Sequence, residues 1–179
     1  MRTELHIPTS AYENVLGHLF SAMDTEHAAF FFARPSTSSD PLVLSVEADY
    51  LVPASGFVRR SAFHFELRDD VQRHLIKEAH ARSCSLVEAH SHPFPAPASF
   101  SETDVIGLLD WVPHVRWRLA GRPYGALVVA PGSFDALIFT GADTQPTPLG
   151  GLIVGRIEMR PTGATEENWE AICDGRRAV

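Results

Sequence analysis

The chain has 179 residues, of which 45% are hydrophobic and 21% are charged. These proportions are typical of a globular protein, and the length fits one domain with a substantial hydrophobic core. The net charge of −7 argues against non-specific binding to nucleic acid, and no apolar run approaches the roughly 18 residues of a membrane span.

The N-terminal segment and the cysteines favour a cytoplasmic protein. The first residues contain no continuous apolar stretch of the kind found in a secretory signal. Cys84 and Cys173 are too few for a disulfide framework, and we interpret both as reduced, unpaired thiols. Neither cysteine lies in a recognisable context for a catalytic nucleophile.

The first half of the chain predicts alternating strands and helices. The helices are indicated by apolar side chains that recur at helical spacing, and the longest strand by strict alternation of apolar and polar residues. In chain order we expect an edge strand at residues 5–7, a helix at 10–23, a buried strand at 27–33, a half-buried strand at 42–50, a strand at 62–67 and a helix beginning at Asp69. Residues 35–41 are polar and include two prolines, which predicts a loop.

The second half continues in the same way. We expect a strand at residues 84–91, a helix from Ser101, a hairpin of strands at 126–130 and 136–140, a strand at 152–159 and a short helix at 166–173. Pro113 should end or kink the helix, because proline lacks the N–H that the helix needs. Strands and helices mixed around one sheet predict an α/β or α+β fold without a second domain.

Two histidines, His90 and His92, carry the clearest chemical signal. Residues i and i+2 of a strand point to the same face about 6.6 Å apart, so both imidazoles can hold one divalent ion. Asp104 follows a proline-rich loop and is well placed to be a third ligand. Two histidines and one carboxylate leave the fourth position of a tetrahedral Zn²⁺ open to water, which is typical of a catalytic site.

The same residues allow other interpretations. Ser101 and Asp104, three apart before an apolar helix, have the pattern of a helix-capping box, and both roles are compatible in one helix start. Glu88 is a rival carboxylate on the same strand face as the histidines. It lies about 13 Å of strand from His92, which is too far to share one ion unless the strand bends sharply.

His90-Ser91-His92-Pro93, followed by Ser101-x-x-Asp104, resembles the H-x-H-P…S-x-x-D signature of the JAMM (JAB/MPN-plus) zinc metalloproteases. The family pattern also has an upstream Glu before a hydrophobic strand, and Glu26 fits that position. The resemblance covers roughly residues 10–140.

The chain departs from the family pattern in two places. Eight residues rather than seven separate His92 from Ser101, and an alternative register pairs Ser99 with Glu102. The segment after Glu26 lacks the small glycines of many relatives, so Glu26 could instead be a solvated turn residue.

The resemblance implies a cytidine-deaminase-like JAB1/MPN fold of three layers, with residues 1–179 as one domain and 146–179 as its C-terminal extension. It implies Zn²⁺ on His90, His92 and Asp104. Glu26 would then be the general base of a metal-activated water, and Ser101 would support the oxyanion.

The resemblance also implies a substrate class. The family typically cuts the amide or isopeptide bond after the C-terminal glycine of a ubiquitin-like protein, in deconjugation or in precursor processing. Expected partners are a ubiquitin-like protein or its conjugates and E1/E2-like proteins of the same operon, some of which are linked to antiphage defence. The competing hypotheses are a non-catalytic MPN-type scaffold and a metallohydrolase for a small molecule or an ordinary peptide.

Overall fold

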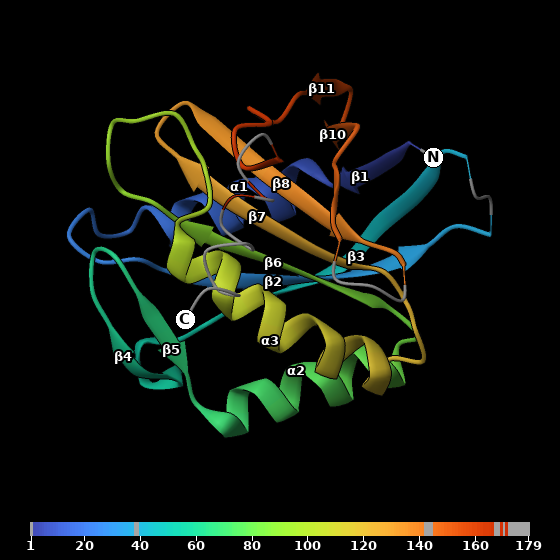
Figure 1. Cartoon of the computed structure of the whole chain (residues 1–179), viewed down its shortest axis with the longest axis horizontal. Coiled ribbons are helices and arrows are strands. Elements are labelled where there is room, and N and C mark those ends of the chain that lie inside the picture. The colour runs from blue at the N-terminus through green and yellow to red at the C-terminus, as the bar shows by residue number, and fades with distance from the viewer. Residues whose placement is uncertain (1, 38–39, 142–144, 167–168, 170, 172–179) are drawn as a thin grey trace.

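The computed structural model describes residues 2–37, 40–141, 145–166, 169 and 171 (Figure 1). These residues form one large mixed sheet with helices on both faces, together with a separate two-stranded hairpin. The mixed α/β class predicted from the sequence is confirmed.

In the part of the chain that the structure describes, nine strands make up the large sheet. They are β1 (Thr3–Ile7), β2 (Ala28–Pro35), β3 (Leu42–Leu51), β6 (Ser85–Ser91), β7 (Tyr124–Ala130), β8 (Ser133–Phe139), β9 (Thr147–Pro148), β10 (Gly151–Val154) and β11 (Ile157–Met159). Their order is β11-β10-β1-β3-β2-β6-β7-β8-β9. β1 pairs in parallel with β3 and β10, and β6 pairs in parallel with β7, while the other neighbours are antiparallel.

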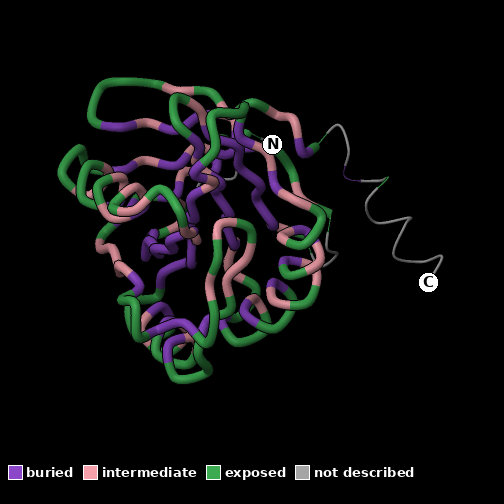
Figure 2. Tube along the Cα trace, turned by 90° about the vertical axis from the view of Figure 1, so that its left-hand side faces the viewer, coloured by how far each residue is buried: buried purple, intermediate pink, exposed green. Residues whose placement is uncertain are grey.

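The three α-helices within the described residues lie on opposite faces of this sheet. Helix α1 (Thr9–Leu19) covers one face, and α2 (Asp69–Ala81) and α3 (Glu102–Arg118) pack together on the other (Figure 1). Strand β2 buries side chains on both faces of the sheet, because Phe30 packs with α2 and α3 whereas Phe31 packs with α1. This explains why the strand is apolar at nearly every position. Figure 2 shows the buried segments gathered in the interior of the molecule and the exposed ones along its outer loops and turns.

A small hairpin of β4 (Phe57–Arg60) and β5 (Phe65–Leu67) follows a short 3₁₀ helix (Ala54–Gly56). The strand expected at 62–67 is therefore shorter than predicted, and β4 was not anticipated. Its turn is closed by the Ser61 N–H, which donates to the His64 carbonyl. Phe63 at the tip of this turn is 72% exposed.

Three other expectations need correction. β1 is not an edge strand, because β10 pairs with its outer side. Of the two effects expected of Pro113, an end of the helix does not occur, because α3 continues to Arg118. The strand expected at 152–159 is divided into β10 and β11, which form a hairpin.

The helix expected at residues 166–173 lies mostly outside the described residues, as does Cys173. Cys84 is buried and free. Within the described part of the chain, no helix is both long and apolar enough to cross a membrane.

Candidate metal centre

The two histidines come from the end of the central strand β6. β6 lies between β2 and β7, and His90 is paired with Ala28 on one side and Val128 on the other. The extended pairing continues one residue beyond the strand, since the His92 N–H donates to the Val129 carbonyl at 2.8 Å. Both imidazoles are therefore held on one face by backbone hydrogen bonds, as the i, i+2 spacing predicts.

Ser91, between the histidines, points the other way and attaches the segment that carries Glu26. Its hydroxyl accepts a hydrogen bond from the His27 N–H at 2.9 Å, and its own N–H donates to the His27 carbonyl at 3.0 Å. This buried serine fixes the start of β2 against the end of β6. Sequence reasoning assigned no function to it.

Asp104 comes from the first turn of α3. Ser101 is the N-cap residue, and its hydroxyl accepts a hydrogen bond from the Asp104 N–H at 3.2 Å. In return, the Ser101 N–H and hydroxyl both donate to Asp104 Oδ2 at 2.7 Å. The capping box predicted from the sequence is present, and it fixes the direction of the Asp104 carboxylate.

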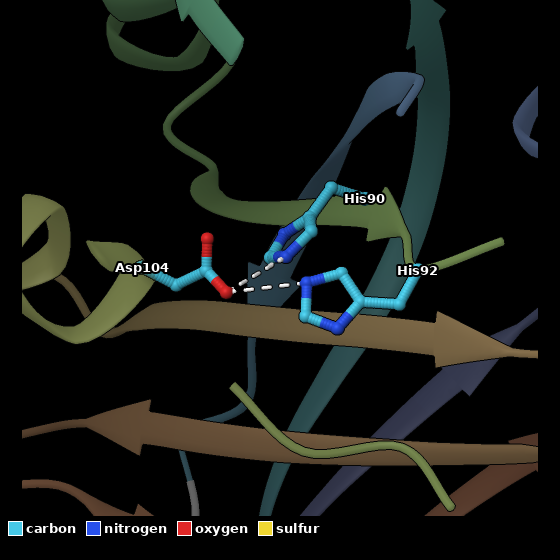
Figure 3. Close-up of side chains that lie close together, drawn as sticks. All are labelled: His90, His92 and Asp104. Atoms are coloured by element: carbon cyan, nitrogen blue, oxygen red, sulfur yellow. Dashed lines mark ion pairs between the residues drawn. The ribbon is translucent and has the colours of Figure 1, made fainter. Parts of the chain in front are cut away.

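The side chains of His90, His92 and Asp104 converge (Figure 3). Asp104 Oδ2 lies 3.2 Å from His92 Nε2 and 3.6 Å from His90 Nε2. Ligands at 2.0–2.1 Å from a tetrahedral Zn²⁺ are about 3.3 Å from one another. The ligand atoms of the three residues all lie within 4.8 Å of one another, so together they could hold a metal ion.

The surroundings of His90 support the same fit. Its side chain is 2% exposed, and within the described chain neither ring nitrogen has a hydrogen-bond partner. A buried imidazole without partners loses its hydration without compensation. A cation bound at Nε2 would satisfy this nitrogen.

The charges at the site favour a cation. Burial opposes the charged form of His90, but the carboxylates of Asp104, Glu88 and Glu26 outweigh this and raise its pKa to about 9. Burial likewise acts to raise the pKa of Asp104, yet the two histidines and Ser101 hold it well below its usual range. The metal-free site therefore binds a proton that a metal ion can replace.

Glu26 lies beside this cluster rather than in solvent. Its residue is only 1% exposed, and its N–H donates to the Ser61 carbonyl in the β4–β5 turn at 2.8 Å. Oε1 lies 3.6 Å from His92 Nε2. The alternative reading of Glu26 as a solvated turn residue is therefore wrong. Burial raises the pKa of Glu26 despite the nearby histidines.

Glu102 and Glu88, the other carboxylates considered as metal ligands, lie outside the group of His90, His92 and Asp104. Glu102, from the alternative register, is exposed at the start of α3. Glu88 is not a rival ligand, but it is closer than its strand position suggested: Oε1 lies 3.9 Å from His90 Nδ1, on the side of the ring opposite Asp104. Sequence reasoning missed this placement.

A cavity of about 220 Å³ opens beside His90 and Asp104. Its apolar wall residues come from β2, β5 and α3 and include Phe30, Phe65, Leu67, Leu108 and Trp111. The cavity has room for a substrate side chain or a small ligand next to the candidate metal centre.

An exposed aromatic pair lies between the β4–β5 turn and the loop after His92. The rings of Phe63 and Phe94 stack with centroids 5.0 Å apart. This contact joins the two segments that flank the metal centre.

Comparison of the chain with known protein families and with curated proteins finds no match. The chemistry of the site therefore depends on its own residues. They comprise three convergent side chains that could bind a metal ion, a buried carboxylate beside one of them and an adjacent cavity. Two imidazoles and a carboxylate with a neighbouring base are suited to metal-assisted hydrolysis.

Proposed function

We propose that the chain is a JAMM-type zinc hydrolase that cleaves after the C-terminal glycine of a ubiquitin-like protein. The observation that supports this most strongly is the convergence of His90, His92 and Asp104, with Glu26 Oε1 3.6 Å from His92 Nε2. On this proposal the sheet and its helices belong to the JAB1/MPN kind of three-layer fold. Residues 1–179 form one domain, with 146–179 as its C-terminal extension.

We propose Zn²⁺ as the metal because two imidazoles and one carboxylate are a ligand set typical of catalytic zinc. When bound, Zn²⁺ supplies Lewis-acid activation of a water molecule and of the scissile carbonyl. His90, His92 and Asp104 would hold it. Asp104 is oriented for this by its hydrogen bonds from Ser101.

Glu26 acts as the general base and later as the general acid. It takes a proton from the attacking water and delivers it to the leaving amine, which must depart in neutral form. Its burial, which raises its pKa, suits a group that must both accept and return a proton near neutral pH.

Ser101 has two successive tasks in this scheme. In the structure its hydroxyl donates to Asp104 Oδ2, so it first orients a metal ligand. Support of the oxyanion requires the same hydroxyl to turn from Asp104 towards the substrate. Its N–H keeps its own bond to Asp104, so the ligand stays positioned during that rotation.

The substrate class follows from the resemblance of the His90-Ser91-His92-Pro93 motif to that of the JAMM family. Partners would be a ubiquitin-like protein or its conjugates and E1/E2-like proteins of the same system. A second candidate is a metallohydrolase for an ordinary peptide or a small molecule. The cavity beside His90 favours it, because a glycine tail has no side chain to fill such a space.

The testing experiment uses ubiquitin-like proteins joined through their C-terminal glycine to a fluorogenic amine. The wild-type chain should release the amine, a chelator should stop it and added Zn²⁺ should restore it. Cleavage of unrelated fluorogenic peptides at an equal rate would favour the second candidate. A chain that binds no metal and cleaves neither substrate would instead fit a non-catalytic scaffold.

A further inference from the structure

A series of buried and half-buried side chains leads away from His90 on the side opposite Asp104, and the proposed hydrolysis does not use it. Trp111 Nε1 donates to the Tyr124 hydroxyl at 3.0 Å. The Tyr124 hydroxyl donates in turn to Glu88 Oε2. The other oxygen of Glu88 is the one that lies 3.9 Å from His90 Nδ1.

Three different elements supply this series, all on the same face of the sheet. Glu88 precedes His90 by two residues on β6, so the two side chains share a face. Tyr124 begins the neighbouring strand β7. Trp111 lies on α3 seven residues after Asp104, which is two turns along the same side of the helix. One helix thus provides a metal ligand and the far end of the series.

The burial of these polar groups lowers the stability of the fold unless they find bonding partners. Tyr124 is fully buried, and the Glu88 side chain is only 15% exposed. Burial of a carboxyl group destabilises a fold unless its oxygens are bonded. Oε2 has a partner in Tyr124, whereas in the described part of the chain no group donates a hydrogen bond to Oε1. The nearest nitrogen recorded for Oε1 is His90 Nδ1.

The two ring nitrogens of His90 have opposite surroundings. Nε2 is directed at Asp104 and Nδ1 at Glu88. A histidine that binds a metal through Nε2 carries its proton on Nδ1 and needs an acceptor there. In metalloproteins that acceptor is commonly a carboxylate, which fixes the orientation of the ring.

We propose that Glu88 is a positioning residue of the metal centre: it accepts a hydrogen bond from His90 Nδ1–H and fixes the ring with Nε2 towards the metal, while Tyr124 and Trp111 fix Glu88. Closure of the 3.9 Å separation to a hydrogen bond requires a shift of about 1 Å. This inference rests on the metal centre of the proposed function but not on its substrate.

The test measures Zn²⁺ affinity, by competition with a chromophoric chelator, in the full chain and its variants. Glu88→Gln keeps the shape but weakens the acceptor, and we expect a loss of about 10–100-fold in affinity. Tyr124→Phe should lower the Zn²⁺ affinity several-fold, because Glu88 loses the hydrogen bond that holds it in place. The double variant should bind Zn²⁺ no more weakly than Glu88→Gln alone, since Tyr124 acts through Glu88.

Matched controls come from other parts of the molecule. Glu47→Gln alters a carboxylate on β3 that is bonded to Arg34, and Tyr12→Phe removes a hydroxyl on α1 that contacts Met159. Both should bind Zn²⁺ like the wild type. Bound Co²⁺ gives a second readout, because its visible absorption should change in Glu88→Gln and not in Glu47→Gln.

Three outcomes would overturn the inference. If Glu88→Gln folds and its Zn²⁺ affinity is within twofold of the wild-type value, Glu88 does not position His90. If Glu88→Gln does not fold, the Tyr124→Phe variant decides instead. An unchanged Zn²⁺ affinity and an unchanged Co²⁺ spectrum in that variant would also overturn the inference. A wild-type chain that binds Zn²⁺ yet cleaves no ubiquitin-like substrate would overturn the proposed function alone, whereas a chain that binds no Zn²⁺ would overturn both.

Discussion

The hydroxyl of Ser101 donates a hydrogen bond of 2.7 Å to Asp104 Oδ2, and this is the same oxygen that faces both histidines. The start of helix α3 and the candidate metal centre thus share one carboxylate oxygen. A capping box is a common local structure, but here it also orients a carboxylate that could bind a metal ion.

Ser101→Ala tests this shared role. Loss of the cap should lower the free energy of unfolding by about 0.5–2 kcal/mol, which denaturant titration measures. Asp104 would also lose one of its two donors, so Zn²⁺ affinity should fall. Ser101→Thr keeps the hydroxyl and should retain most of both properties. Full stability and affinity in Ser101→Ala would show that the backbone alone orients Asp104.

Glu26→Gln should separate metal binding from turnover. Glu26 is not one of the three convergent ligands, so the variant should contain as much Zn²⁺ as the wild type. Its cleavage rate should fall by about 10²–10⁴-fold, the usual contribution of a general base. Glu13→Gln, on the exposed side of α1, is the control and should cleave at the wild-type rate. Unchanged cleavage by Glu26→Gln would require another base.

Asp104→Asn and Glu102→Gln distinguish the two possible registers of the loop after His92. Asp104 lies against both histidines, whereas Glu102 is exposed two residues earlier. Asp104→Asn should lose most Zn²⁺ binding in equilibrium dialysis, and Glu102→Gln should keep it. The opposite result would support the register with Ser99 and Glu102.

Zn²⁺ binding should depend steeply on pH. The pKa of His90 in the metal-free protein is about 9, so at pH 7 a metal ion must displace its proton. Affinity should then rise about tenfold for each unit between pH 6.5 and 8.5. Calorimetry in buffers of different ionisation enthalpy should show release of about one proton. Affinity that does not change with pH would contradict a protonated His90.

The stability of the metal-free chain should show the opposite trend. The folded-state pKa of His90 exceeds its ordinary value of 6.5, so the folded state holds this proton more tightly than the unfolded state. The resulting stabilisation is complete below about pH 6.5 and is lost as pH rises towards 9. Thermal unfolding in the presence of a chelator measures it, and His90→Ala should lack this part of the pH dependence.

Local patterns predicted the parts of the site that depend on nearby residues. The i, i+2 spacing of His90 and His92 and the Ser101–Asp104 capping box are properties of one strand and one helix start. Burial of Glu26 was not predictable in this way, because it depends on the distant β4–β5 turn, whose Ser61 carbonyl binds the Glu26 N–H.

Contacts between distant segments also explain which features of the fold could not be predicted from the sequence. The interior position of β1 depends on β10, about 150 residues later. The role of Glu88 depends on Tyr124 and Trp111, which no local pattern connects to it. One signal was available: Glu88 is an acidic residue within an otherwise buried strand, where apolar side chains are the rule.

We propose that His90, His92 and Asp104 together hold one zinc ion. The most direct measurement is metal content by mass spectrometry after equilibration with Zn²⁺ at pH 7.5 and removal of loosely bound metal. The account predicts about one zinc per wild-type chain and close to none in His92→Ala. Equal zinc in both proteins, or none in the wild type, would contradict it.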